Sequence, residues 1–189
     1  MVVSGNLGQT KFHEIVSMAS SKTGILEFWN LPGRRNCTLY IKNGHLRCLQ
    51  VGGHYADPLQ AKAFLLELVS AHVGSFELRI VPFQTPCDPA LNWPLERVLF
   101  SLTVMDDEIK YRTAELAPPD ALYRAVEGAS LPASSASFFW ERAHPRLSQG
   151  ITARELAGVL NISEHLACYY LAKLEGMGLV RHQHGQPSS

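Results

Sequence analysis

An Asn-Gly dipeptide flanked by alternating apolar and polar residues is the feature that most constrains the fold of this chain. Asn43 and Gly44 tolerate the two positive φ angles of a type I′ turn, so the sequence predicts a hairpin with strands at 37–42 and 45–51. A two-residue turn also determines which residues pair across the hairpin. The expected partners are Lys42 with His45, Tyr40 with Arg47, and Leu39 with Cys48.

The two faces of this hairpin differ in composition. The face expected to join the core carries Cys37, Leu39, Ile41, Leu46 and Cys48. The opposite face, expected to meet solvent or a partner, carries Thr38, Tyr40, Lys42, His45 and Arg47. Tyr40 and Arg47, with Trp29 from a neighbouring strand, suit a protein interface because aromatic and arginine side chains are enriched there. An ordinary cross-strand pair on a solvated sheet is the alternative.

Helices and further strands flank the hairpin within the first 81 residues. An apolar stripe predicts a helix over 11–21, and strands are expected at 25–29 and 75–81. A second, strongly apolar helix is expected over 57–72. Residues 1–81 therefore predict a small α+β domain with an antiparallel sheet.

Residues 82–130 differ in charge and in proline content, and predict a helical connector. They hold four Lys/Arg and eight Asp/Glu, although the chain has no net charge overall. Three prolines keep the start of this region out of a sheet interior, and helices are expected from Pro94 to about Arg112 and over 120–127. The longer helix carries an apolar stripe that either forms a dimer seam or packs on the chain's own domains. The stripe residues are Leu95, Val98, Leu102 and Ile109.

The last region, residues 131–189, carries the pattern of a helix-turn-helix. Thr152 is a suitable N-cap for a helix over 153–160, and Ser163 for a helix that runs to about Glu175. A strand is expected to begin at about Leu179. The complete chain is therefore predicted to be α+β, with a C-terminal helical module that ends in a short strand.

Several short motifs in a fixed order resemble a known bacterial domain over about residues 4–112. They are Gly5-Asn6-Leu7, Lys22-Thr23-Gly24, the hairpin centre from Tyr40 to Leu46, and Gly74-Ser75-Phe76-Glu77-Leu78. In this order they resemble the PatA-like N-terminal domain, a domain of unknown function in bacterial signalling proteins. The resemblance implies a regulatory or adaptor module rather than an enzyme, and it supplies no catalytic residues.

Residues 138–182 resemble the winged helix-turn-helix of bacterial transcription regulators. The motifs are Ile151 to Ala157, Leu160 to Ser163, and Leu171 to Val180. The resemblance implies that the helix over 163–173 reads DNA, with phosphate contacts from neighbouring residues. The implied DNA-binding residues are Arg154, Ser163, His165, Tyr169, Lys173, Arg181 and His182.

The small net charge of the last region argues against DNA binding. Residues 131–189 hold five Lys/Arg and four Asp/Glu, so they can neutralise few DNA phosphates. The alternative is a winged helix that serves dimerisation or protein docking, with Tyr169 and Tyr170 as contact surface.

The sequence offers little for catalysis or metal binding. It contains no GxSxG, P-loop, HExxH or dinucleotide-binding motif. His165 and Cys168 are three residues apart, and His182 and His184 two apart, but neither pair belongs to a complete tetrahedral ligand set. We therefore predict no catalytic residue, metal site, cofactor or small-molecule substrate.

Cysteine usage and the absence of long apolar runs predict a cytoplasmic location. Cys37 and Cys48 lie diagonally on the predicted core face, where a disulfide is conceivable but buried thiols are favoured. The four cysteines form neither a CxxC pair nor the regular spacing of a disulfide-rich domain, which is typical of a reducing compartment. No run of about 18 apolar residues predicts a membrane span, and the N-terminus does not resemble a signal peptide.

The sequence thus predicts a non-enzymatic bacterial regulatory protein that forms a homodimer. Its first domain would bind a protein signalling partner or self-associate, and its winged helix would deliver the output, with double-stranded DNA as the candidate target. The alternative is a protein–protein adaptor in a signalling or motility system, with a winged helix that does not bind DNA.

Overall fold

The computed structural model divides the chain into two compact units, Met1–Asp106 and Asp107–Ser189. It describes residues 1–34, 36–88, 90–112, 116, 119–131 and 134–183. Pro89, one of the three prolines at the start of the region 82–130, and His184 lie outside the described residues. The boundary between the units falls inside the region 82–130 that the sequence predicts as a connector, and each unit is described here by itself.

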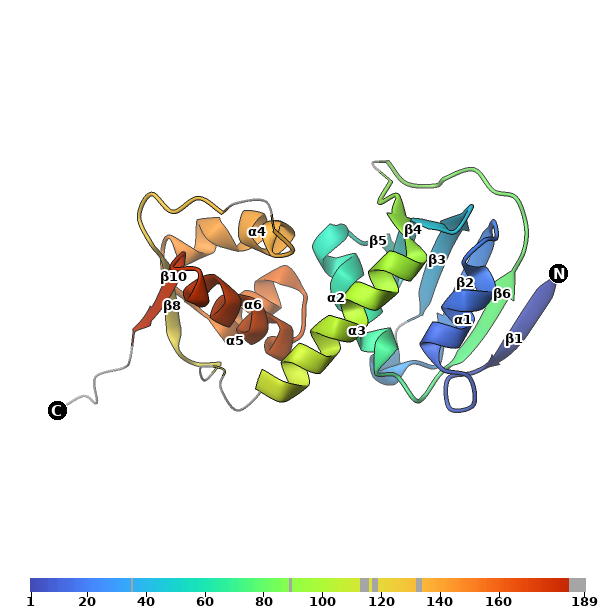
Figure 1. The fold of residues 1–189 in the computed structure, drawn as a ribbon, viewed down its shortest axis with the longest axis horizontal. Coiled ribbons are helices and arrows are strands. Elements are labelled where there is room, and N and C mark those ends of the chain that lie inside the picture. The colour runs from blue at the N-terminus through green and yellow to red at the C-terminus, as the bar shows by residue number, and fades with distance from the viewer. Residues whose placement is uncertain (35, 89, 113–115, 117–118, 132–133, 184–189) are drawn as a thin grey trace. The chain divides into compact units, whose positions relative to one another are not determined.

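The first unit is built on one antiparallel sheet (Figure 1). Its strand order is β1-β6-β2-β3-β4-β5, and β7 pairs with β4. The strands are β1 (Val2–Asn6), β2 (Gly24–Trp29), β3 (Cys37–Lys42), β4 (His45–Val51), β5 (His54–Tyr55), β6 (Ser75–Arg79) and β7 (Trp93–Pro94). The α+β class and the antiparallel sheet predicted from the sequence are thus confirmed.

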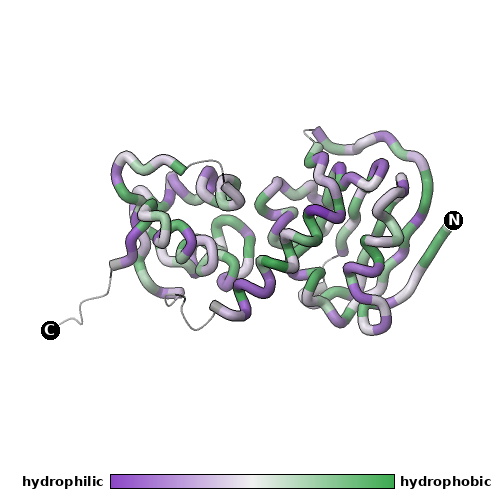
Figure 2. Tube along the Cα trace, in the orientation of Figure 1, coloured by the Kyte–Doolittle hydropathy of each residue, from purple (hydrophilic) through white to green (hydrophobic). Residues whose placement is uncertain are grey.

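Three helices accompany this sheet: α1 (Phe12–Ala19), α2 (Pro58–Val69) and α3 (Leu95–Arg112). Asp57 caps α2, because its carboxylate accepts a hydrogen bond of 2.9 Å from the backbone N–H of Gln60. Phe28 of β2 lies in the core between helix and sheet, with ring centroids 5.9 Å from Phe12 of α1 and 6.4 Å from Phe76 of β6. Figure 2 shows hydrophobic and hydrophilic residues mixed along α3.

The predicted Asn-Gly hairpin is present, but its register is only partly as expected. Asn43 and Gly44 have φ angles of 51° and 73°, and Lys42 pairs with His45. Gly44 is also required by close packing, since a Cβ atom there would lie 1.8 Å from the carbonyl oxygen of Ser20. The turn chemistry read from the sequence therefore agrees with the structure.

Beyond Leu46 the predicted pairs are wrong, because a β-bulge adds one residue to β4. Tyr40 pairs with Cys48 rather than Arg47, and Leu39 pairs with Leu49 rather than Cys48. A one-residue slip exchanges the two faces of a strand. Leu49 therefore takes the core-facing position beside Leu39, and Cys48 turns to the face that carries Tyr40.

The second unit contains three helices and a small antiparallel sheet with strand order β10-β8-β9 (Figure 1). Its elements are β8 (Leu122–Ala125), α4 (Ser137–Leu147), β9 (Ile151–Thr152), α5 (Ala153–Leu160), α6 (Glu164–Gly176) and β10 (Val180–Gln183). The helix predicted over 120–127 is wrong: strand β8 lies there, because its backbone pairs with β10 on one side and β9 on the other.

Helices α5 and α6 form a helix-turn-helix with the predicted caps. The Thr152 hydroxyl accepts from the N–H of Glu155 at 3.2 Å, and the Ser163 hydroxyl accepts from the N–H of Leu166 at 3.2 Å. Asn161, with φ of 54°, turns the chain between the helices. Among the described residues a single strand, β10, follows α6, and it pairs with β8, which precedes all three helices. The winged-helix arrangement is therefore not established by the fold.

No helix among the described residues has both the length and the apolar composition that a membrane span requires.

Candidate interaction surfaces

The outer face of the hairpin, predicted as a protein interface, carries a segment of the chain itself. We call residues 81–88 and 90–92 the strap. The ring of Phe83 lies 5.6 Å from the ring of Tyr40, edge to face. The N–H of Leu91 donates to the Arg47 carbonyl at 2.8 Å, and the Arg47 guanidinium donates to Asn92 Oδ1 at 2.5 Å. Tyr40 and Arg47 are consequently only half-exposed.

The structure does not place Trp29 beside Tyr40 and Arg47. Tyr40 pairs with Ile25 at the start of β2, whereas Trp29 ends that strand and pairs with Ser75. Trp29 therefore lies on the same face as Tyr40 but at the other end of the strand.

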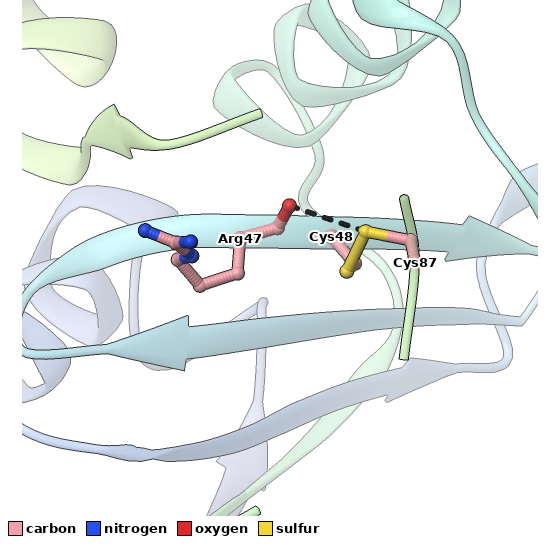
Figure 3. Close-up of a disulfide and its surroundings, with 3 residues drawn as sticks. All are labelled: Arg47, Cys48 and Cys87. Atoms are coloured by element: carbon pink, nitrogen blue, oxygen red, sulfur yellow. Dashed lines mark hydrogen bonds between the residues drawn. A yellow bond between two sulfur atoms is a disulfide. The ribbon is translucent and has the colours of Figure 1, made fainter. Parts of the chain in front are cut away.

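A disulfide joins the strap to the hairpin. Cys48 is bonded to Cys87, with their Cα atoms 6.1 Å apart (Figure 3). The Arg47 carbonyl oxygen lies 3.4 Å from the Cys87 sulfur, a contact that Figure 3 marks with a dashed line. The preference for a buried thiol at Cys48 was wrong, because the bulge turns Cys48 toward the strap and away from Cys37.

The other two cysteines are buried thiols, as predicted for Cys37. Burial raises the pKa of both Cys37 and Cys168 above the ordinary thiol value, since the thiolate would lose its hydration. Neither thiol is therefore suited to nucleophilic chemistry at neutral pH.

The predicted stripe on α3 divides between core and half-buried positions. Leu95 and Leu102 are 2% and 1% exposed, so they pack inside the first unit. Val98 and Ile109 are half-buried. This distribution favours packing of the stripe on the chain's own domains over its use as a dimer seam.

Helix α6, implied to read DNA, is largely a packing helix. Its buried residues are Leu166, Ala167, Cys168, Tyr169, Tyr170, Leu171 and Leu174. The Tyr170 ring stacks on Phe139 of α4 at a centroid distance of 4.7 Å. Tyr169 is 4% exposed, and its hydroxyl donates to the carboxylate of Glu108. Tyr169 is therefore not available to a DNA base.

Carboxylates lie beside two of the residues implied to contact DNA, Arg154 and His182. Arg154 forms ion pairs with Asp120 at 2.9 Å and with Glu164 at 3.0 Å. These carboxylates hold the pKa of Arg154 above its ordinary value, and the largest cause is the hydrogen bond that Arg154 donates to Glu164. His182 Nδ1 lies 2.6 Å from Glu175 Oε1. Phosphate would have to compete with these partners.

The remaining implied DNA-binding residues are differently placed. Ser163 is used as the cap of α6. The Lys173 ammonium lies 3.2 Å from Ser135 Oγ and 5.6 Å from the centre of the Tyr169 ring. His165 and Arg181 are exposed. The structure thus does not gather the seven residues into one basic surface.

One feature of the second unit was missed from the sequence. Arg181 on β10 pairs directly with Arg124 on β8, and both side chains are exposed. Like charges at directly opposed strand positions destabilise a sheet, so the pair offers a site for an anionic group. The sequence did not predict that Arg124 and Arg181 lie opposite each other, because residues 120–127 were expected to form a helix.

The described residues lack a cluster of metal ligands, but the first unit has a groove. No group of three or more potential metal ligands is found among them. The first unit has a mainly apolar groove of about 500 Å³, lined by residues that include Leu31, Phe64, Leu68 and Val73.

Comparison of the chain with protein-family models, with curated proteins and with solved structures finds no match.

Proposed function

We propose that the chain is a non-enzymatic regulatory adaptor that acts through protein contacts, and that α6 does not read DNA. The observation that carries this proposal is the commitment of α6 to internal packing. A reading helix presents polar side chains to base edges in the major groove, whereas Tyr169 and Tyr170 are buried in the second unit.

The charge of the second unit supports the same conclusion. Residues 107–189 hold eight Lys/Arg and nine Asp/Glu. Affinity for DNA arises largely from cations that neutralise phosphates and release counterions. With Arg154 paired to two carboxylates, the surface around the helix-turn-helix offers few such cations.

The adaptor proposal agrees with the resemblance of residues 4–112 to the PatA-like domain, which implies the same kind of module in bacterial signalling. A cytoplasmic location belongs to the proposal as well. In a reducing cytoplasm most molecules would carry Cys48 and Cys87 as free thiols rather than as a disulfide. Alkylation of thiols in freshly lysed cells therefore tests the cytoplasmic location.

The second candidate function is DNA contact through the small sheet, as in the winged helix implied by the resemblance. It is favoured by one observation, the exposed and opposed Arg124 and Arg181. Phosphate groups would relieve the repulsion between the two guanidinium groups.

A salt titration of duplex binding, followed by fluorescence anisotropy on the full chain, tests the proposal. At about 50 mM salt, where non-specific binding is strong, we expect no saturable binding of a mixed-sequence duplex by the wild-type protein. The variant Asp120→Asn/Glu164→Gln should bind detectably, because it frees Arg154 and removes two repulsive carboxylates.

Wild-type binding that Lys173→Ala weakens would contradict the proposal. A different outcome is wild-type binding with a salt dependence, the slope of log K against log salt, that falls by about 2 in Arg124→Ala/Arg181→Ala. That result would establish DNA contact through the small sheet, since each phosphate contact contributes about 0.9 to the slope. His165→Ala, a change at an exposed histidine of α6, is the matched control and should leave any such sheet-mediated binding unchanged.

A further inference from the structure

The outward face of α3 carries an exposed stripe that the packing of the first unit does not use. We call it the outer stripe: Arg97, Phe100, Val104, Asp107 and Tyr111, all exposed. Phe100 is 73% exposed and Val104 is 43% exposed. The inner face of the same helix supplies Leu95, Leu102 and Met105 to the core. The helix thus carries large apolar side chains on its exposed face as well as on its buried face.

The spacing of the outer stripe is that of a helix-pairing seam. Its members follow one another at intervals of three, four, three and four residues. This heptad spacing keeps the side chains on one line that can face a second helix. Phe100 and Val104 lie between two opposite charges, with Arg97 on the N-terminal side and Asp107 on the C-terminal side.

We propose that two copies of this chain pair through the outer stripe, with their α3 helices antiparallel. In this register Phe100 of each copy packs on Val104 of the other, and Arg97 of each copy meets Asp107 of the other. One two-fold axis relates both sets of contacts, as a closed dimer interface requires. The same register places Glu96 opposite Lys110 of the second copy at the edge of the seam.

The charges determine the orientation of the pair. Parallel helices would place Arg97 against Arg97 and Asp107 against Asp107, and like charges across an interface disfavour association. Antiparallel helices convert both repulsions into ion pairs. The occupant that the stripe fits best is therefore its own copy, because every charged position finds its complement there.

The contact is small beside the roughly 800 Å² that each partner contributes to a standard interface. The dimer is accordingly expected to exchange with monomer, and to weaken at high salt. The inference does not depend on the proposed function, since a chain that binds DNA could pair in the same way and a monomer could still dock another protein.

Sedimentation velocity of the full chain over a concentration series tests this dimer. Wild-type protein should pass from monomer to dimer as its concentration rises. Arg97→Asp and Asp107→Arg should each raise the dissociation constant about tenfold or more, because each replaces two ion pairs by two like-charge contacts. The double variant Arg97→Asp/Asp107→Arg should return it to within about threefold of wild type.

Phe100→Ala should also weaken the dimer about tenfold or more, as loss of a central aromatic contact does. Val159→Ala, at a 51% exposed valine of α5, is the matched control and should change nothing. A wild-type chain that stays monomeric at every concentration would overturn the inference and leave the stripe to a different partner. A dimer that the single variants do not weaken, or that the double variant does not restore, would overturn it equally.

Discussion

Among single residues, Tyr123 of β8 is the one whose burial has the clearest consequence for the stability of the second unit. Its side chain is fully buried, with the ring 5.9 Å from that of His182. The hydroxyl is buried and has no hydrogen-bond partner among the described residues. A buried hydroxyl without a partner lowers stability, because it loses its hydrogen bonds to water.

We predict that Tyr123→Phe raises the free energy of unfolding by about 1 kcal/mol at neutral pH. Chemical denaturation followed by circular dichroism measures this change. Tyr111→Phe removes a hydroxyl from an 86% exposed side chain and should have little effect. A clear destabilisation by Tyr123→Phe would show that the hydroxyl is satisfied, contrary to the structure.

The same residue gives the protein a sensitivity to alkali. Burial raises the pKa of Tyr123 to about 12, with smaller contributions from nearby Cys168 and Glu175. A phenol whose pKa is raised on folding favours the folded state below its unfolded pKa of about 10 and loses that contribution as the pH rises to 12. Stability measured across this window should therefore fall less steeply in Tyr123→Phe than in wild type. Equal slopes would contradict the assignment.

At the scale of elements, the strap depends on its disulfide. The bond closes a loop between residues 39 positions apart. We predict that Cys48→Ala/Cys87→Ala lowers the free energy of unfolding by about 2–4 kcal/mol, mainly because the unfolded chain gains freedom. Thermal or chemical denaturation of the first unit's sheet measures the effect.

Reductant provides the control for this prediction. Dithiothreitol should destabilise the wild-type protein by a similar amount and leave the double variant unchanged. Equal stability of oxidised and reduced wild-type protein would show that the strap holds to the hairpin without the bond.

Elements determined by local sequence were predictable, and elements determined by distant contacts were not. The turn at Asn43 and Gly44 and the caps at Thr152 and Ser163 each depend on a few neighbouring residues, and they agree with the structure. Strand β8 depends on pairing with β10, which is more than fifty residues away. A segment of only four residues carries no strong local signal for a strand.

The site was less predictable than the fold for the same reason. The β-bulge in β4 has no recognisable motif in the sequence. The bond of Cys48 to Cys87 joins the hairpin to the strap, which the sequence shows only as a proline-containing segment. Similarly, Arg154 is a basic residue in the sequence, and only the fold shows that Asp120 and Glu164 lie beside it. Residue type alone does not reveal which charges are already paired.

At the scale of the whole molecule, two surfaces distinguish the functions considered. The helix-turn-helix of the second unit has its tyrosines buried and its Arg154 paired with carboxylates. The outer stripe of α3 exposes an aromatic ring between opposite charges. We therefore propose that the chain associates through α3, while α6 serves internal packing.

An NMR titration of the full chain tests whether α6 contacts DNA. Backbone amide chemical shifts would be recorded at low salt while a mixed-sequence duplex is added. We expect the amide signals of the turn at 161–163 and of Glu164–Gly176 to keep their chemical shifts. Progressive shifts centred on Ser163, His165 and Lys173, reversed by added salt, would contradict it.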